Sequence, residues 1–239
     1  MQPFGAVLDD MTGNAHGVTA TASFYMSGVN NIIAIRPSPA AGTIMQAASC
    51  NCGHTRLLVK SMKHFNFPEK FHALHDKALR QYTAGQRGVQ SYFSADELAF
   101  LTANGLTAQN LFDYAEDLHN QGEPSYDQAL AIELVRRDYF LNIQLGRPSA
   151  QILDVDTMPA KTEAVLGIEW LPRLIPKAKA KLRGELPSTL MYCCGGDRRF
   201  FTTRDILPAE FLTLVWRNLE DNTAIIHWVA ERSGRAKSI

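Results

Sequence analysis

The sequence predicts an all-α protein of two helical lobes, which are joined by a linker and preceded by a poorly ordered N-terminal leader. Apolar residues recur at steps of three and four through most of the chain after residue 62. Helix-capping residues flank these periodic segments. No stretch indicates a β-hairpin, and no internal repeat is evident. These observations favour helices packed on helices.

The leader is the segment 1–61, whose composition differs from that of the rest. It holds two acids, three bases and many small residues, without a sustained helical or strand period. Ordered periodicity begins directly after it, so we interpret Met62 as an alternative translation start. A transit peptide is the competing interpretation because acids are scarce, although arginine is scarce as well.

The acidic lobe, residues 62–147, is predicted to contain four helices. Its name comes from the stretch between Arg87 and Arg136, which holds eight acids and no lysine or arginine. Side-chain oxygens at a helix start satisfy free backbone amides, and this is the role we assign to the capping residues here. In chain order the helices are expected over 67–83, from the Ser94–Glu97 capping box to near Gly105, from Thr107, and from the Ser125–Gln128 capping box to just before Gly146.

The linker, residues 148–167, contains two prolines and no clear period. The basic lobe, residues 168–239, follows it and has eight bases against three acids between residues 168 and 204. Its first helix begins at Pro172 or Pro176 and ends at Gly184, because proline is tolerated only in a first turn. Further helices are expected from Pro208 and from a cap at Asp221 or Asn222.

The opposite charges of the two lobes allow two interpretations. They are either separate solvated faces, or complementary surfaces that dock and set the orientation of the lobes. The cations of the first basic helix are interpreted as a solvated face; they are Arg173, Lys177, Lys179, Lys181 and Arg183. Nucleic-acid binding is not expected, because no aromatic stacking platform or reading motif accompanies these bases.

Composition narrows the compartment and the partners. The 239 residues are 46% hydrophobic and 20% charged, with a formal net charge of zero. A neutral chain has no overall attraction to nucleic acid or to an anionic membrane. No window of 18 apolar residues predicts a membrane span. The four cysteines lie in two close pairs rather than a disulfide scaffold, so we expect a reducing, cytoplasmic location.

No metal site and no cofactor are predicted. Glu69 with His72, and Glu116 with His119, match the Glu-x-x-His spacing of di-iron bundles. Both pairs lie off the inward stripes of their helices, whereas bundle ligands point inward. The Cys-x-Cys-x-His segment at 50–54 fits the spacing of structural zinc sites poorly. The chain also lacks a Walker loop, a dinucleotide fingerprint and a nucleophile elbow.

Two motifs of the basic lobe resemble a bacterial family of domains of unknown function. The first is the segment 170–178, WLPRLIPKA, and the second is the loop 192–200, YCCGGDRRF. The family pattern is an LPRxIxKA helix followed by a YxCGGDRxF-like loop and two closing helices. The segment 136–141, RRDYFL, resembles family members with an extra helical lobe. The resemblance covers about residues 67–232. It implies a helical, cytoplasmic protein and no particular activity, and Cys193 departs from the pattern.

The loop Cys194–Arg199 is the leading candidate site. Its glycines allow backbone angles that other residues avoid, and Asp197 is expected as a helix N-cap. Amides at a helix start and nearby guanidiniums attract anions. We therefore predict that a small anionic ligand or an acidic protein surface binds here, with Cys194 as a weak candidate nucleophile. The predicted ligand-binding residues are Gly195, Gly196, Asp197, Arg198 and Arg199.

An alternative interpretation is structural. A Gly-Gly-Asp turn is a common helix start, cysteine packs well as a small apolar residue, and the arginines of the loop have many acidic partners available in the other lobe. In that case the chain is a structural or protein-interaction module. Arg136, Arg137 and Tyr192 are predicted to bridge the lobes or to contact the ligand, because a partly buried arginine needs a partner.

Overall fold

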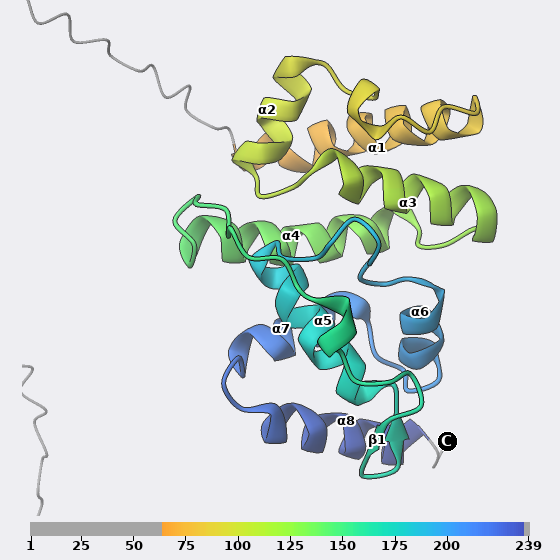
Figure 1. The fold of residues 1–239 in the computed structure, drawn as a ribbon, viewed down its shortest axis with the longest axis vertical. Coiled ribbons are helices and arrows are strands. Elements are labelled where there is room, and N and C mark those ends of the chain that lie inside the picture. Colours follow the sequence, from red (N-terminus) through yellow and green to blue (C-terminus); the bar gives the residue numbers. More distant parts are fainter. Residues whose placement is uncertain (1–63, 237–239) are drawn as a thin grey trace, which may run out of the picture. The chain divides into compact units, whose positions relative to one another are not determined.

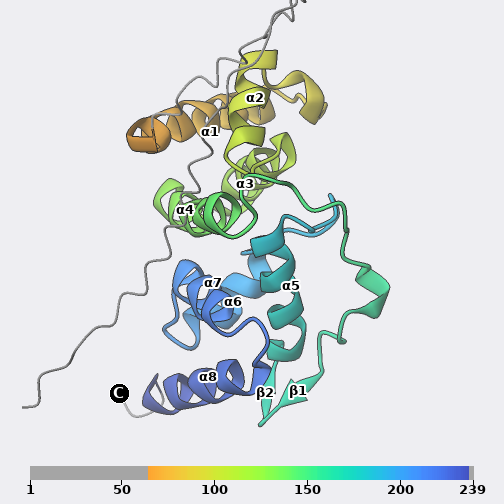
Figure 2. The same cartoon turned by 90° about the vertical axis from the view of Figure 1, so that its left-hand side faces the viewer.

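The computed structural model describes residues 64–236, and this part of the chain is all-α, as the sequence predicts. Figures 1 and 2 show α1, α2 and α3 on one side of α4, and α5 to α8 on the other. The proposed leader, the start at Met62 and the cysteine segment at 50–54 lie outside the described residues. The helices are α1 (Phe67–Thr83), α2 (Ala95–Ala103), α3 (Ala108–Gln121), α4 (Tyr126–Asn142), α5 (Leu171–Arg183), α6 (Gly195–Thr202), α7 (Pro208–Arg217) and α8 (Asn222–Ala236).

Capping residues start the helices of the acidic lobe where the sequence predicts. Ser94, Thr107 and Ser125 each accept a hydrogen bond from the amide three residues later. In each case the side chain at that third position returns a bond to the cap amide. These reciprocal bonds satisfy amides that have no partner within the helix.

Proline and glycine set the ends of α5. The helix begins at Leu171, with Pro172 in its first turn and Pro176 inside it, so the alternative start at Pro176 is wrong. Gly184 ends the helix in the left-handed conformation with φ 72°, as predicted. Pro208 opens α7, and the Asp221 carboxylate accepts from the amide of Ala224 at the start of α8.

The buried side chains form two clusters, and α4 contributes to both. The first cluster joins α1, α2 and α3 with Ala129 of α4. The second joins α5 to α8 with Ile132 and Tyr139 of α4. The boundary between the clusters therefore falls inside one helix, earlier in the chain than the predicted linker.

The segment before α5 contains a short β-hairpin that the sequence prediction missed. Strands β1 (Ala164–Val165) and β2 (Ile168–Glu169) pair antiparallel. The two residues between them, Leu166 and Gly167, have φ of 50° and 72°. A two-residue turn with both φ values positive matches the twist of a hairpin, but leucine is a rare residue at such a position. The sequence prediction missed this hairpin because the usual Asn-Gly or Asp-Gly turn signal is absent at these two positions.

Membrane insertion through a helix receives no support from the described residues. None of the helices between residues 64 and 236 combines the length and the apolar character that a membrane crossing needs.

Candidate functional site

The candidate loop forms the start of α6, but its backbone differs from the prediction. Cys194 is the N-cap and Gly195 the first helical residue, so Asp197 is the third helical residue instead of the predicted cap. The left-handed residue is Cys193, with φ 71°, and neither Gly195 nor Gly196 has a positive φ. The Asp197 carboxylate reaches back and accepts from the amide of Cys193 at 2.8 Å. It thereby satisfies an amide at the helix start without being the cap.

Close packing, rather than backbone freedom, explains the two glycines. A Cβ atom on Gly196 would lie 2.5 Å from the ring of Trp170. A Cβ on Gly195 would lie 2.9 Å from the side-chain oxygen of Gln121 in α3. Both distances are shorter than carbon and oxygen atoms tolerate, so glycine lets α6 approach its neighbours closely.

Asp197 is the centre of a buried polar network between α5 and α6. Its side chain has no exposed surface, and its two oxygens accept from the indole of Trp170 at 2.9 Å and the ammonium of Lys177 at 2.6 Å. Lys177 is 2% exposed and also lies 3.1 Å from the sulfur of Cys194. A buried carboxylate with three donors needs no further ligand, because its charge and hydrogen-bonding capacity are satisfied.

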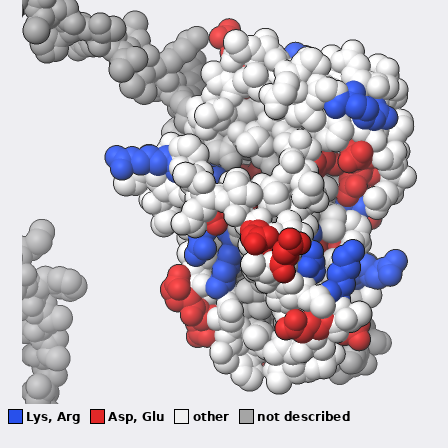
Figure 3. Space-filling view, viewed as in Figure 1, with Lys and Arg blue, Asp and Glu red and all other residues white. Residues whose placement is uncertain are grey.

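Arg198 joins α6 to the acidic lobe. Its guanidinium is 6% exposed and donates to Asp117 and to Gln121, both of α3, at 2.7 Å each. It also donates to the Cys193 carbonyl at 2.7 Å, and its Nε lies 3.2 Å from the Glu123 carboxylate. These contacts agree with the docking interpretation of the lobe charges. On the face drawn in Figure 3, basic and acidic side chains lie next to one another over the C-terminal helices.

The remaining predicted residues near this loop have other surroundings. Arg199 is exposed on α6. The hydroxyl of Tyr192 donates to the Pro208 carbonyl at 2.8 Å and is buried within the second core cluster. Burial raises the pKa of the Cys193 thiol to about 12. Cys194 is partly exposed, and both cysteines are free.

A second buried ion pair links α4 to α5. The Glu133 carboxylate accepts from Lys181 at 2.5 Å and from Tyr114 of α3 at 2.8 Å, both on the same oxygen. Its other oxygen is buried without a hydrogen-bond partner among the described residues. Lys177 and Lys181, four positions apart on α5, are therefore both buried. The prediction that they belong to a solvated face is wrong for both residues.

Arg136 and Arg137 point to different places. Arg137 donates to Asn104 at 2.6 Å and its guanidinium carbon lies 4.7 Å from the ring centroid of Phe67, within the acidic lobe. Arg136 is 3% exposed and donates to the side-chain oxygen of Gln144 at 2.9 Å. Gln144 in turn donates to the carbonyl of Arg183, so this chain of bonds reaches the end of α5.

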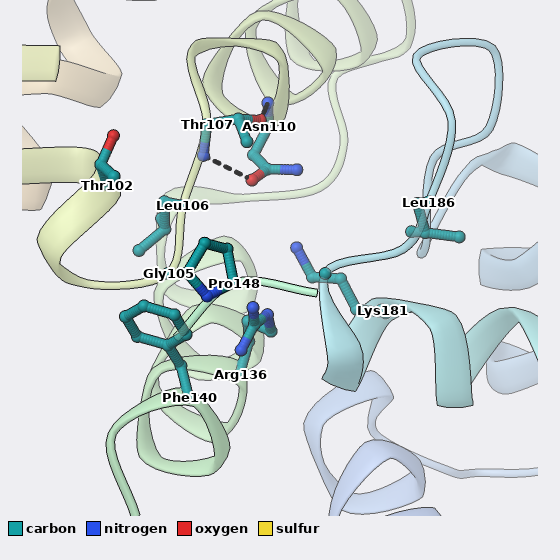
Figure 4. A pocket seen from close by; sticks show the side chains of 11 residues that line it. Thr102, Gly105, Leu106, Thr107, Asn110, Arg136, Phe140, Pro148, Lys181 and Leu186 are labelled. Carbon is teal, nitrogen blue, oxygen red and sulfur yellow. Dashed lines mark hydrogen bonds between the residues drawn. The ribbon is translucent and has the colours of Figure 1, made fainter. Parts of the chain in front are cut away.

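A cavity of about 160 Å³ lies beside Arg136, and we name it the interlobe pocket. Figure 4 shows Arg136 and Phe140 entering it from α4, Lys181 from the end of α5, and Asn110 from the start of α3. Leu106 and Leu186 also contribute walls. The two cations come from two different helices, Arg136 from α4 and Lys181 from α5.

The interlobe pocket thus combines the side chains of Arg136 and Lys181 with apolar walls. The sequence analysis singled out Arg136, but it assigned Lys181 to a solvated face and did not find the pocket, because the convergence of the two side chains depends on how α4 and α5 pack. A metal site has no support in the described residues, where no three His, Cys, Asp or Glu side chains gather suitably.

Comparisons with protein-family models, with curated proteins and with solved structures each gave no match. The family resemblance drawn from the two motifs therefore stays a prediction.

Proposed function

We propose that this protein binds a small organic anion in the interlobe pocket, and Arg136 carries the proposal. Among the described residues no carboxylate lies within ion-pair distance of its guanidinium, although the side chain is 3% exposed. The carboxylates of Glu133 and Glu185 favour its charged form only from a greater distance. An anion in the adjoining cavity would pair with the guanidinium directly and so reduce the cost of burying its charge.

The state of Arg136 supports an incoming negative charge. Burial lowers the pKa of its guanidinium to about 10, because the charged form loses hydration. Nη1 is used by Gln144, while Nη2 and Nε have no hydrogen-bond partner among the described residues. That free edge matches the bidentate geometry of a carboxylate. Through Gln144, which also bonds the Arg183 carbonyl, the cation lies near the carboxyl end of α5. The partial negative charge of that helix end stabilises the guanidinium before a ligand binds.

The start of α3 adds donors on the opposite side of the pocket. The Asn110 side chain gives its oxygen to the amide of Thr107, which leaves its NH₂ group for the cavity. A helix start carries partial positive charge, so this wall favours the same sign of ligand as Arg136 does. Lys181 contributes less, because Glu133 already neutralises it.

Size and lining narrow the ligand to a compact apolar carboxylate. The volume of about 160 Å³ compares with cavities of about 150 Å³ that hold a benzene ring. Phe140, Pro148 and Leu186 supply apolar wall beside the cations. A benzoate-sized acid would place its ring on these side chains and its carboxylate at Arg136.

Isothermal titration calorimetry with sodium benzoate, acetate and inorganic phosphate tests the proposal. We expect benzoate to bind best, and Arg136→Gln to weaken its binding at least tenfold. Arg147→Gln is the matched control, because it removes an exposed charge near the pocket. Arg136→Lys keeps the charge and serves if the glutamine variant does not fold. Equal affinity of the wild type and both Arg136 variants for benzoate, or no binding of any of the three anions, would contradict the proposal.

A second candidate is a structural or protein-interaction module, which the contacts of Arg198 favour. In this proposal the loop 194–199 fastens α6 to α3, and an acidic partner would meet the exposed Arg199. The anion site predicted at this loop stays a prediction, and an Arg199→Gln variant in the same titrations tests it. The cytoplasmic location also stays a prediction. The two free thiols are consistent with it.

A further inference from the structure

Cys194, Lys177 and Asp197 form a cluster that the proposed anion site does not use. The Lys177 Nζ atom lies 3.1 Å from the Cys194 sulfur and 2.6 Å from an Asp197 oxygen. The ion pair is buried, so the lysine has little freedom to leave the sulfur. An amine nitrogen is therefore held against a thiol, with a carboxylate in position to take a proton from the nitrogen.

Access separates the two neighbouring cysteines. Cys194 is partly exposed at the N-cap of α6, whereas Cys193 has no exposed surface. Partly exposed thiols beside a cation are typical of cysteines that oxidise. Cys194 is therefore the more accessible of the two cysteines.

We propose that Cys194 is a site of modification by hydroperoxides, and that Lys177 captures the oxidised sulfur. In the first step the thiol attacks the peroxide, the O–O bond breaks, and Cys194 becomes a sulfenic acid while hydrogen peroxide leaves as water. Sulfur is oxidised by two electrons and the peroxide is reduced by two.

In the second step the Lys177 nitrogen displaces the sulfenic oxygen. Asp197 takes a proton from the lysine ammonium, the freed amine attacks sulfur, and an N–S bond forms as the S–O bond breaks. The oxygen leaves with two hydrogens as a second water. No further oxidant is needed, because a sulfenic acid condenses with nitrogen to a sulfenamide without a change in total oxidation state. The product joins α5 to α6 covalently.

Peptide mapping after hydrogen peroxide treatment tests this inference, in full-length protein carrying Cys50→Ser and Cys52→Ser. We expect a linked peptide pair containing Lys177 and Cys194, lighter by two hydrogens than the sum of its parts. Dithiothreitol should separate the pair, because a thiol attacks the sulfur and releases the amine.

Three variants decide the outcome. Cys194→Ser should abolish the linked pair, and Cys193→Ala should retain it. Lys177→Arg keeps a cation for Asp197 but cannot form the product, so sulfenic acid should accumulate at Cys194 and react with dimedone at least fivefold more than in the wild type. Equal dimedone labelling of the wild type and Lys177→Arg, or peroxide oxidation without a linked pair in the wild type, would overturn the inference.

Discussion

The guanidinium of Arg198 and the carboxylate of Asp117 lie 2.7 Å apart, although 81 positions separate them in the chain. Arg198 was predicted as a site residue because it belongs to the loop that follows the glycine pair. Its partner, Asp117, is one of the acids that define the acidic lobe. The pair shows that the charge difference between the two parts of the sequence is used internally, at a contact between α3 and α6.

Removing the Arg198 cation should destabilise the protein strongly. Arg198→Met leaves a carboxylate partly buried without its counter-ion, and breaking such a pair costs about 3 kcal/mol. Urea denaturation measures the free energy of unfolding, and Arg199→Met is the control at an exposed neighbour. The control should change that free energy by less than about 0.5 kcal/mol. Similar losses in both variants would show that Arg198 does not fasten the helices.

The Asp113 carboxyl should make stability depend on pH. Burial raises its pKa from 3.8 to about 6. The folded state therefore binds the proton more tightly than the unfolded state. The contribution of this proton binding to the free energy of unfolding is fully present below pH 3.8 and is lost as the pH rises through 6.

Asp113→Asn should therefore stabilise the protein by about 2 kcal/mol at pH 8, and much less at pH 3.5. Urea denaturation of the wild type and the variant at both values measures the difference. A gain of equal size at the two values would mean that the charge of Asp113 is not its cause.

His75 should oppose folding at acid pH. It is 1% exposed, neither ring nitrogen has a hydrogen-bond partner among the described residues, and burial lowers its pKa from 6.5. The unfolded state therefore binds the proton better, and stability falls as the pH drops below 6.5. His75→Leu should flatten the pH dependence of the melting temperature between pH 7.5 and 5, while His227→Gln, at an exposed position, should leave it unchanged. A wild-type slope in the His75 variant would exclude this role.

Gly196→Ala should reduce stability even though alanine favours helices. The added methyl group would meet the Trp170 ring at 2.5 Å, and overpacking of this kind costs about 1–3 kcal/mol. Gly234 of α8 provides the comparison, because a Cβ there meets no atom of the described residues within 4 Å. Gly234→Ala should gain up to about 1 kcal/mol. If both alanine variants gain stability in urea denaturation, the tight approach of Trp170 to α6 is wrong.

The sequence predicted the helices well because their signals are local. Ser94, Thr107 and Ser125 act within one turn, and Gly184 and Pro208 act through their own backbone angles. These effects need no knowledge of the partner helix.

The site was harder to predict because its signals are not local. Lys177 and Lys181 looked solvated because their partners, Asp197 and Glu133, lie 20 and 48 positions away. The glycine pair before Asp197 suggested backbone freedom, whereas the structure explains it by close packing against two residues distant in the chain, Gln121 and Trp170. Helical periodicity identifies which side of a helix is apolar, but it does not reveal which charges find each other across a boundary.

Helix α4 serves both core clusters, and this sharing limits how the protein can come apart. Cleavage of the chain before α4 would separate Ala129 from the rest of the first cluster. Cleavage after α4 would separate Ile132 and Tyr139 from the rest of the second. Either fragment would show apolar surface to water, so no single cleavage yields two self-sufficient halves. Residues 64–236 should consequently melt in one cooperative transition, and damage on one side of α4 should loosen the other.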